Sequence, residues 1–316
     1  MRKLVAAVLL APFAIGFLSP GAAVEPPAPD PVFHFTDPEI TESSGLVARD
    51  GLVVTMNDSG DGNRVFTVDP ATGDTVGVTR WQGDATDIEA LAPAGRGEVW
   101  VGDIGDNAGS RDHVEVARVP FGRGDREVHA PTYRLVYPDG PHDAETLLAD
   151  PATGRLYVVA KEFIGRLYAA PEHLDPDGPN RLTAVDEVLG IATDGTFTPD
   201  GKHLVLRNYG QAAVYTWPGL QRVAQVDLPR QQQGEGLAIS ESGEVLVGSE
   251  GAGAEVLRVD LPLEGASASP SEQVEEDGER APVRAEEQRS WWPWALGGVA
   301  GVVMIGVLLR SLRPRD

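Results

Sequence analysis

The body of the chain, residues 32–262, consists of short apolar runs divided by Gly, Pro, Asp and Asn. The runs contain four to seven residues and are alternating or fully apolar, a pattern typical of β-strands. Clear examples are Leu52-Val53-Val54-Thr55-Met56, Glu98-Val99-Trp100-Val101-Gly102, Leu156-Tyr157-Val158-Val159-Ala160, Leu204-Val205-Leu206 and Glu244-Val245-Leu246-Val247. No stretch has a helical period, apart from a short turn at residues 171–174. The pattern predicts an all-β domain.

A short motif, with acidic or polar residues at alternate positions before a Leu, recurs along this body. It reads Glu42-Ser43-Ser44-Gly45-Leu46, Asp87-Ile88-Glu89-Ala90-Leu91, Asp143-Ala144-Glu145-Thr146-Leu147 and Gln233-Gly234-Glu235-Gly236-Leu237. The copies start 45, 56 and 90 residues apart, and the last interval contains a degenerate copy, Thr193-Asp194-Gly195-Thr196-Phe197. Each copy precedes a strongly apolar strand and two weaker ones, about 45 residues in all. That is the size of a four-stranded propeller blade.

We therefore expect a five-bladed β-propeller. The fifth copy has only three strands, residues 235–239, 244–248 and 255–260. Residues 32–36 can supply the fourth, and an N-terminal strand that completes the last blade closes the ring without an exposed edge. A six-bladed propeller is the alternative, but it requires splitting a segment that has no spare strands. A two-sheet sandwich would not produce the repeat.

The N-terminus has the features of a secretory signal peptide, residues 1–23. Arg2 and Lys3 form a positive region, residues 4–18 are mainly apolar, and small residues precede a polar, Pro-rich segment. An uncleaved N-terminal anchor is the alternative. We expect the propeller, residues 24–264, to lie outside the cytoplasm.

The C-terminus is expected to anchor the protein in a membrane. Residues 291–309 carry no charge, begin with three tryptophans and precede the Arg-rich tail, residues 310–316. As a helix rising about 1.5 Å per residue, this segment would span roughly 28 Å, close to the hydrocarbon thickness of a bilayer. Residues 265–290 are rich in Ala, Ser, Pro and Glu, which predicts a disordered acidic stalk. The predicted location is therefore the cell membrane, with a single pass.

Composition narrows the possible functions. The chain has 26 Lys and Arg against 48 Asp and Glu, and its net charge of −22 excludes nucleic acid as a partner, because phosphate binding needs a basic face. It contains no Cys, which excludes disulfides, thiolate catalysis and Cys-ligated metal centres. It also has no Gly-x-Ser-x-Gly elbow, phosphate loop or dinucleotide fingerprint, so no organic cofactor is expected.

The repeated motif concentrates carboxylates at one place in the predicted fold. The first strand of each blade lines the central channel and starts near one mouth, so Glu89, Glu145 and Glu235 should occupy equivalent positions there. The second strands also end in polar residues: Asn57-Asp58, Asp103, Lys161-Glu162, Arg207-Asn208 and Ser249-Glu250. Crowded carboxylates favour cation binding, and we expect a divalent cation, Ca²⁺ first, with Glu89, Glu145, Glu235, Asp103 and Asn208 as ligands. Alternatively, these oxygens accept hydrogen bonds from backbone N–H groups at strand ends.

Four polar residues near the motifs are candidate catalytic groups: Asp87, Asp143, His142 and Lys161. His142 can act as a general base, although a loop histidine without function is the simpler interpretation. Lys161 stands among acids and either neutralises the carboxylate ring, which is the favoured interpretation, or binds an anionic substrate group. Arg207 and Tyr209 occupy the matching place in the next blade and allow the same two interpretations.

Two loops have oxygen-rich sequences. Asn57-Asp58-Ser59-Gly60-Asp61-Gly62-Asn63 has the alternation of a Ca²⁺ loop, but Asn57 replaces the first Asp and Val68 replaces the bidentate Glu at the twelfth position. Asp103-Ile104-Gly105-Asp106-Asn107 can point oxygens at the channel or form a turn stabilised by Asx hydrogen bonds. A polar turn is the simpler interpretation of the first loop. For the second loop, the channel-facing oxygens and the Asx-stabilised turn are equally supported.

The repeated motifs and acid-ended second strands resemble secreted bacterial β-propellers of the phytase-like esterase and gluconolactonase–regucalcin groups. The resemblance spans residues 32–262 and rests on short, degenerate motifs, in which Glu89, Glu145 and Glu235 match. It implies that acidic residues and Asn in the channel hold a divalent metal, usually calcium, that polarises a phosphate or a lactone. The six blades common in those groups are not expected here.

Two classes of function follow. The first is a membrane-anchored binding or scaffold module for a cell-envelope protein, a glycan or a small anionic ligand. The second is a metal-dependent hydrolase of phosphoesters, lactones or sugars at the channel mouth. Propellers support both, and the missing catalytic signature favours binding.

Overall fold

The computed structural model describes residues 31–58 and 60–263. The chain divides into two compact units, Met1–Ala268 and Ser269–Asp316, and every described residue belongs to the first. The predicted signal peptide, stalk, membrane helix and basic tail lie outside the described residues. Over the ranges that are described, no helix has the length and apolar character needed to cross a membrane.

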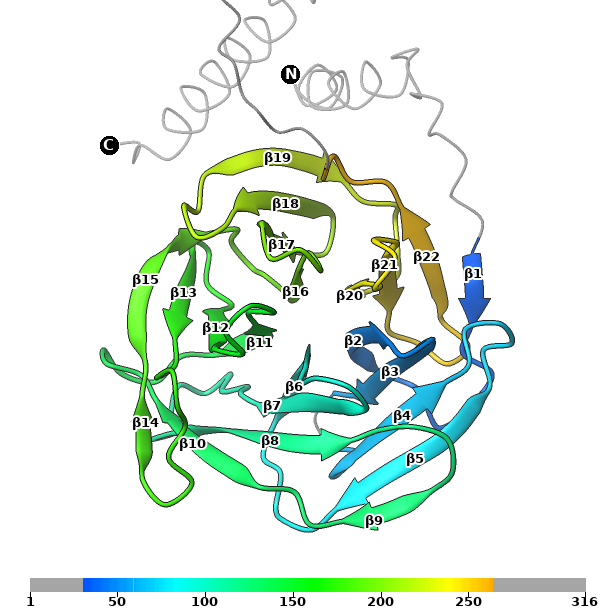
Figure 1. Ribbon diagram of the computed structural model, residues 1–316, viewed down its shortest axis with the longest axis horizontal. Coiled ribbons are helices and arrows are strands. Elements are labelled where there is room, and N and C mark those ends of the chain that lie inside the picture. Colours follow the sequence, from blue (N-terminus) through cyan, green and yellow to red (C-terminus); the bar gives the residue numbers. More distant parts are fainter. Residues whose placement is uncertain (1–30, 59, 264–316) are drawn as a thin grey trace, which may run out of the picture. The chain divides into compact units, whose positions relative to one another are not determined.

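Within the described residues, twenty-two strands form five sheets arranged around a common centre (Figure 1). Blade 1 contains β2 (Ser43–Arg49), β3 (Leu52–Asn57), β4 (Arg64–Val68), β5 (Thr75–Trp81) and β9 (Arg126–Val128). Blade 2 contains β6 (Ile88–Pro93), β7 (Glu98–Asp103), β8 (Val114–Pro120), β10 (Thr132–Val136) and β14 (Pro179–Arg181). Blade 3 contains β11 (Ala144–Ala149), β12 (Leu156–Ala160), β13 (Gly165–Ala169) and β15 (Thr183–Val188). Blade 4 contains β16 (Asp194–Phe197), β17 (His203–Arg207), β18 (Gln211–Thr216) and β19 (Arg222–Asp227). Blade 5 contains β20 (Gly234–Ile239), β21 (Val245–Ser249), β22 (Glu255–Val259) and β1 (Pro31–His34).

The predicted all-β, five-bladed propeller is confirmed. Each copy of the repeated motif contributes the innermost strand of a blade, namely β2, β6, β11, β16 and β20. The degenerate copy at Thr193-Asp194-Gly195-Thr196-Phe197 does so as well, through β16. Adjacent inner strands contact one another around the whole circle, so the ring is closed (Figure 1).

The predicted closure of the last blade by the N-terminal strand is also observed. β1 pairs antiparallel with β22, with His34 opposite Glu255 and Phe33 opposite Val256. Phe33 and Phe35 are buried and pack edge to face, their ring centroids 5.5 Å apart. The last blade is therefore built from both ends of the propeller sequence, which leaves no open edge at the junction.

Two blades differ from the simple four-strand repeat. β9, from the connection between β8 and β10, pairs parallel with β5 of blade 1. β14, from the connection between β13 and β15, pairs parallel with β10 of blade 2. Each short strand covers the outer edge of the preceding blade, where an unpaired row of backbone groups would otherwise face solvent.

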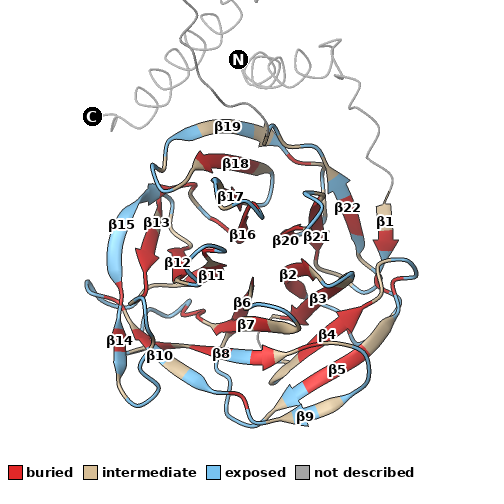
Figure 2. Cartoon of the chain, viewed as in Figure 1, coloured by how far each residue is buried: buried red, intermediate tan, exposed pale blue. Residues whose placement is uncertain are grey.

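The core lies between the blades. Five clusters of buried apolar residues each join strands of neighbouring blades, as Leu147 of β11 and Val116 of β8 do in one of them. Figure 2 shows the strands near the centre mainly buried and the outer strands β15 and β19 more exposed. This packing fixes the inner strands, and with them the side chains at the channel mouth.

Candidate metal centre

The inner strands begin and the second strands end at one face of the propeller, which we call the channel mouth. Pairing between these strands is interrupted there by a β-bulge in four of the five blades. The bulges contain Glu89 in β6, Glu145 in β11, Glu235 with Gly236 in β20, and Ser44 with Gly45 in β2. A bulge changes the direction of a side chain at the end of a ladder. The repeated glutamates are therefore the residues that leave the regular pairing.

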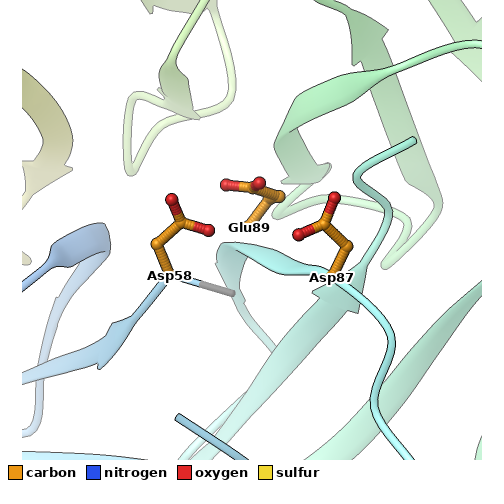
Figure 3. Close-up of side chains that lie close together, drawn as sticks. All are labelled: Asp58, Asp87 and Glu89. Atoms are coloured by element: carbon orange, nitrogen blue, oxygen red, sulfur yellow. The ribbon is translucent and has the colours of Figure 1, made fainter. Parts of the chain in front are cut away.

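Three carboxylates form a cluster at this mouth (Figure 3). Asp58 follows β3, Asp87 precedes β6 and Glu89 lies in β6; one oxygen from each lies within 4.8 Å of the others. In Figure 3 the three carboxyl groups point toward a common space. Glu89 is buried, and burial together with the charges of Asp58 and Asp87 raises its pKa to about 11. Without a cation, Glu89 is protonated at neutral pH and shares a hydrogen bond with Asp58.

The loop after β7 holds Asp87 in place. Asp103 accepts hydrogen bonds from the backbone N–H of Thr86 and of Asp87, both at 2.9 Å. It also forms an ion pair with Arg111 at 2.7 Å. Gly105 N–H donates to the Asp87 carbonyl at 3.1 Å. Asp103, an expected metal ligand, thus positions the segment that carries Asp87 and is not one of the three clustered carboxylates.

Gly105 also makes room for the cluster. A Cβ at this position would lie 2.4 Å from Asp87 Oδ2 and 2.9 Å from Glu89 Cγ. These distances are shorter than van der Waals contact, so a larger residue would displace the carboxylates.

A buried ion pair adjoins the cluster. Lys161 Nζ bonds Glu145 Oε1, while Glu145 Oε2 is buried with no hydrogen-bond partner. Burial and the neighbouring carboxylate of Glu235 raise the pKa of Glu145 to about 7, although Lys161 opposes the shift. Burial lowers the pKa of Lys161, but its bonds to Glu145 and Tyr209 outweigh this and raise it. Lys161 therefore neutralises part of the ring.

The fifth blade contributes a second pair of acids. Glu235 is buried, accepts a hydrogen bond from Gln233 Nε2 at 3.1 Å, and has a second oxygen with no partner. Burial, followed by the charge of Glu235, raises the pKa of Glu250 to about 8. Glu250 therefore keeps its proton more readily than an exposed glutamate near neutral pH.

Two further buried side chains stabilise the backbone at the β-bulges. Asp194 Oδ2 accepts backbone hydrogen bonds from Leu46 at 3.3 Å and from Leu237 at 2.6 Å, the two residues that follow the bulges of β2 and β20. Fully buried Arg207 donates to the carbonyls of Gly236 and Gly248 at 3.0 and 3.1 Å. These side chains satisfy backbone groups that the bulges leave unpaired.

Several predicted residues lie outside the cluster. Asn208 caps its own loop by accepting the backbone N–H groups of Gly210 and Gln211. Asp143 accepts the backbone N–H of Asp106 at 2.8 Å. Asp106 in turn accepts the N–H groups of residues 110 and 111, so its carboxylate stabilises this loop.

His142 belongs to a separate hydrogen-bonded network. Its Nδ1 lies 2.7 Å from Glu162 Oε1 and its Nε2 lies 3.0 Å from Asp139 Oδ1 and 2.9 Å from the Tyr168 hydroxyl. Both ring nitrogens are thus engaged within the protein.

The loop that resembled a Ca²⁺ loop is used differently. Asn57 accepts the backbone N–H groups of Thr41 and Glu42, and Asp61 pairs with Arg64. Of the described residues in this segment, Asp58 is the one that belongs to the cluster. The polar ends of the second strands at Asp58 and Glu250 were the sequence signal for these two ring members, but they were not singled out as ligands.

The donor set suits a hard divalent cation. Asp58, Asp87 and Glu89 offer carboxylate oxygens around one space, and two more buried carboxylate oxygens at the mouth have no partner. Ca²⁺ prefers oxygen ligands at flexible geometry. The described residues therefore contain an acidic cluster that can bind a metal.

Comparison with models of protein families, and with curated protein sequences, finds no match. Among solved structures, a luciferin-regenerating enzyme is similar, with 13% identical residues, 73% of this chain and 81% of that chain covered, and a TM-score of 0.42. A gluconolactonase from Xanthomonas campestris is similar with 14% identity, 72% and 88% coverage, and a TM-score of 0.42. The five-blade assignment rests on the sheet pairing of this chain.

Proposed function

We propose that this chain is a membrane-anchored, extracytoplasmic binding protein whose channel mouth holds a divalent cation, and that Ca²⁺ is the favoured cation. The observation that carries the proposal is the convergence of Asp58, Asp87 and Glu89 within 4.8 Å. The unpartnered buried oxygens of Glu145 and Glu235 at the same mouth support it.

A cation explains a charge arrangement that is otherwise costly. Buried carboxylates close to one another destabilise the charged form, and Glu89 must hold a proton to relieve this repulsion. A divalent cation can replace that proton and pair with all three acids. Ca²⁺ takes six to eight oxygen ligands, so water or a bound ligand would complete its coordination.

The binding role follows from this incomplete coordination. Three carboxylates leave positions at which a small anionic ligand, or an oxygen of a glycan or protein partner, can reach the cation. Asp58 and Asp87 are only partly buried, which keeps the site accessible from the mouth.

Thermal unfolding of the full chain in EDTA and in millimolar Ca²⁺ tests the proposal. Binding to the folded state alone stabilises it by about 2.7 kcal/mol at a hundredfold excess over Kd, so Ca²⁺ should raise the melting temperature by several degrees. Asp58→Asn and Glu89→Gln should lose most of this gain. The control Glu172→Gln, an exposed carboxylate in another loop, should keep it. Equal midpoints in EDTA and Ca²⁺ for the unaltered chain would refute the cation site.

A metal-dependent hydrolase is the second candidate, and Glu145 is the observation that favours it. Its pKa of about 7 suits a general base at neutral pH, and it lies beside both Lys161 and the acidic cluster. In this role, Glu145 would accept a proton from an attacking water, and Lys161 would hold an anionic substrate group.

Assays of phosphoester and lactone hydrolysis separate the two candidates. A hydrolase should lose at least about a hundredfold in rate on Glu145→Gln, while Ca²⁺ still stabilises that variant. Absence of Ca²⁺-dependent turnover on either substrate class would leave the binding function alone.

A further inference from the structure

Exposed apolar side chains gather at one part of the channel mouth. Five large apolar side chains are exposed among the described residues, and four of them lie in three neighbouring loops. These four are Phe163 (90% exposed), Ile164 (55%), Tyr209 (41%) and Ile191 (39%), which we call the apolar lip. Scattered single exposed apolar residues are ordinary, but a contiguous group marks an interaction surface.

The three loops of the apolar lip are joined by specific contacts. Ile191 N–H donates to the Glu162 carbonyl at 2.7 Å, and Asn208 Nδ2 donates to the Gly190 carbonyl at 3.3 Å. Lys161 Nζ lies 5.5 Å from the centre of the Tyr209 ring. The apolar lip is therefore a built surface shared by blades 3 and 4.

The backbone at Ile191 is strained. Its φ of 54° lies in the left-handed region, where a β-branched residue is an outlier. The loop is also tightly packed, since a Cβ on Gly190 would lie 2.0 Å from the Phe163 carbonyl oxygen. Glycine would adopt the conformation at position 191 without strain. The backbone strain at Ile191 is therefore not offset by full burial of its side chain, which is 39% exposed.

The shape of the apolar lip favours a protein partner over a small ligand. Small ligands bind in concave pockets that bury most of their surface. Phe163 projects into solvent, and two cavities, of about 760 and 830 Å³, are lined by other residues. A projecting apolar side chain gains most when a partner supplies the surrounding pocket.

The charge around the apolar lip defines the partner further. Glu162 and Asp139 are partly exposed beside it, and Arg166 pairs with Asp139. The carboxylates of the mouth adjoin the apolar lip through Lys161 and Glu145, so acidic groups outnumber basic ones around it. A second copy of this chain, or an anionic membrane, would bring like charges together and be repelled. We propose that the apolar lip docks a protein partner that presents apolar side chains flanked by Lys or Arg. None of the four residues of the apolar lip belongs to the acidic cluster.

Peptide binding to the full chain in phosphatidylcholine nanodiscs tests the proposal. The probe is a short fluorescein-labelled peptide of alternating Lys and Leu, compared with Lys–Ser and Glu–Leu peptides of equal length. The Lys–Leu peptide should bind in a saturable way and more weakly in high salt, and the other two should bind at least about tenfold more weakly. Nanodiscs without protein supply the background.

Variants distinguish docking from a structural role. Phe163→Ser and Ile191→Gly should each weaken peptide binding about tenfold, because both remove apolar contact area. Ile191→Gly should also raise the melting temperature, since it relieves strain. Val185→Ser alters the exposed apolar residue on β15, outside the apolar lip, and should change neither.

Several outcomes would overturn the proposal. These are equal binding of the Lys–Leu and Lys–Ser peptides, unchanged binding by Phe163→Ser, or saturable binding to vesicles of phosphatidylglycerol in place of the peptide. Concentration-dependent self-association that Phe163→Ser abolishes would identify a second copy as the occupant instead. Ca²⁺ binding is measured separately, so failure here leaves the cation site untouched.

Discussion

At the scale of single residues, the space beside Asp87 decides whether the cluster can form. Gly105 packs against Asp87 and Glu89 so closely that an added methyl group would overlap both side chains. Its φ is not in the left-handed region, so alanine is compatible with the backbone, and the three atoms nearest to an added Cβ belong to the side chains of Asp87 and Glu89. Gly105 is thus a positioning residue for the cation site.

Gly105→Ala should therefore weaken Ca²⁺ binding by about tenfold or more, because it displaces two of the three ligands. Titration of the variant with Ca²⁺, followed by thermal unfolding, measures this. Gly210→Ala is the matched control, since a Cβ there has no atom within 4 Å. Equal loss in both variants would mean that the effect is not local to the cluster.

The proton on Glu89 makes stability depend on pH. The folded-state pKa of about 11 exceeds the ordinary value of 4.5, so above about pH 5 the unfolded chain releases a proton that the folded chain keeps. Stability of the metal-free protein should therefore fall as pH rises from about 5 to about 8. The raised pKa values of Glu145 and Glu250 act in the same direction.

Glu89→Gln replaces the protonated carboxyl with a neutral amide of the same shape. In EDTA this variant should lose less stability than the unaltered chain between about pH 5 and about pH 8, and at about pH 8 it should be the more stable. Unfolding midpoints across this range provide the measurement. Parallel profiles for the two proteins would show that Glu89 titrates normally.

At the scale of elements, the β-bulges explain how the acidic cluster forms. They also show why its members could not all be predicted from the sequence. The recurring motif placed Glu89, Glu145 and Glu235 at the starts of inner strands correctly, because strand spacing and turn residues are local signals. Which of these glutamates would gather with Asp58, and which would pair with Lys161, depends on contacts between blades that no local pattern records. For the same reason, the ion pair between Asp103 and Arg111 could not be predicted from the sequence.

Asp194 is a buried acid that accepts backbone hydrogen bonds. This structural role was the alternative to cation binding for the carboxylates of the repeated motif. Asp194 accepts the backbone N–H groups of Leu46, Gly195 and Leu237, so Asp194→Ala should leave three buried donors unpaired and cost about 3 kcal/mol. Chemical denaturation measures the change. The control Asp200→Ala, in an exposed turn, should cost under about 1 kcal/mol. A small effect at Asp194 would mean that water replaces the carboxylate.

A second feature at the scale of elements is the pairing of β1 with β22, which completes blade 5 and closes the propeller. Phe33→Ala removes a buried ring from the strand that completes blade 5 and should lower stability by about 3 kcal/mol or more. Val185→Ala, on the exposed strand β15, should change it by less than about 0.5 kcal/mol. Similar denaturation curves for Phe33→Ala and the unaltered protein would remove β1 from the account of closure.

At the scale of the whole molecule, the repeat determined the architecture. Five motif copies predicted five blades, and the missing strand of the last blade was found by counting, since a propeller must close. The parallel strands β9 and β14 were not expected, because a three-residue strand without a strong apolar pattern looks like a loop. The exposure of Phe163 and Ile191 also needed the structure, since both occur in sequences that would suit a buried strand.

The molecule as a whole is acidic, and its channel mouth concentrates this charge around a small space. The central claim is that a divalent cation occupies that space in place of a proton. Isothermal titration of the full chain with Ca²⁺ near neutral pH, in two buffers of different ionisation enthalpy, tests it most directly. The account predicts one saturable site whose binding releases protons, because Glu89 must deprotonate to become a ligand, and both signals should disappear in Glu89→Gln. Absence of saturable heat, or binding without proton release, would contradict it.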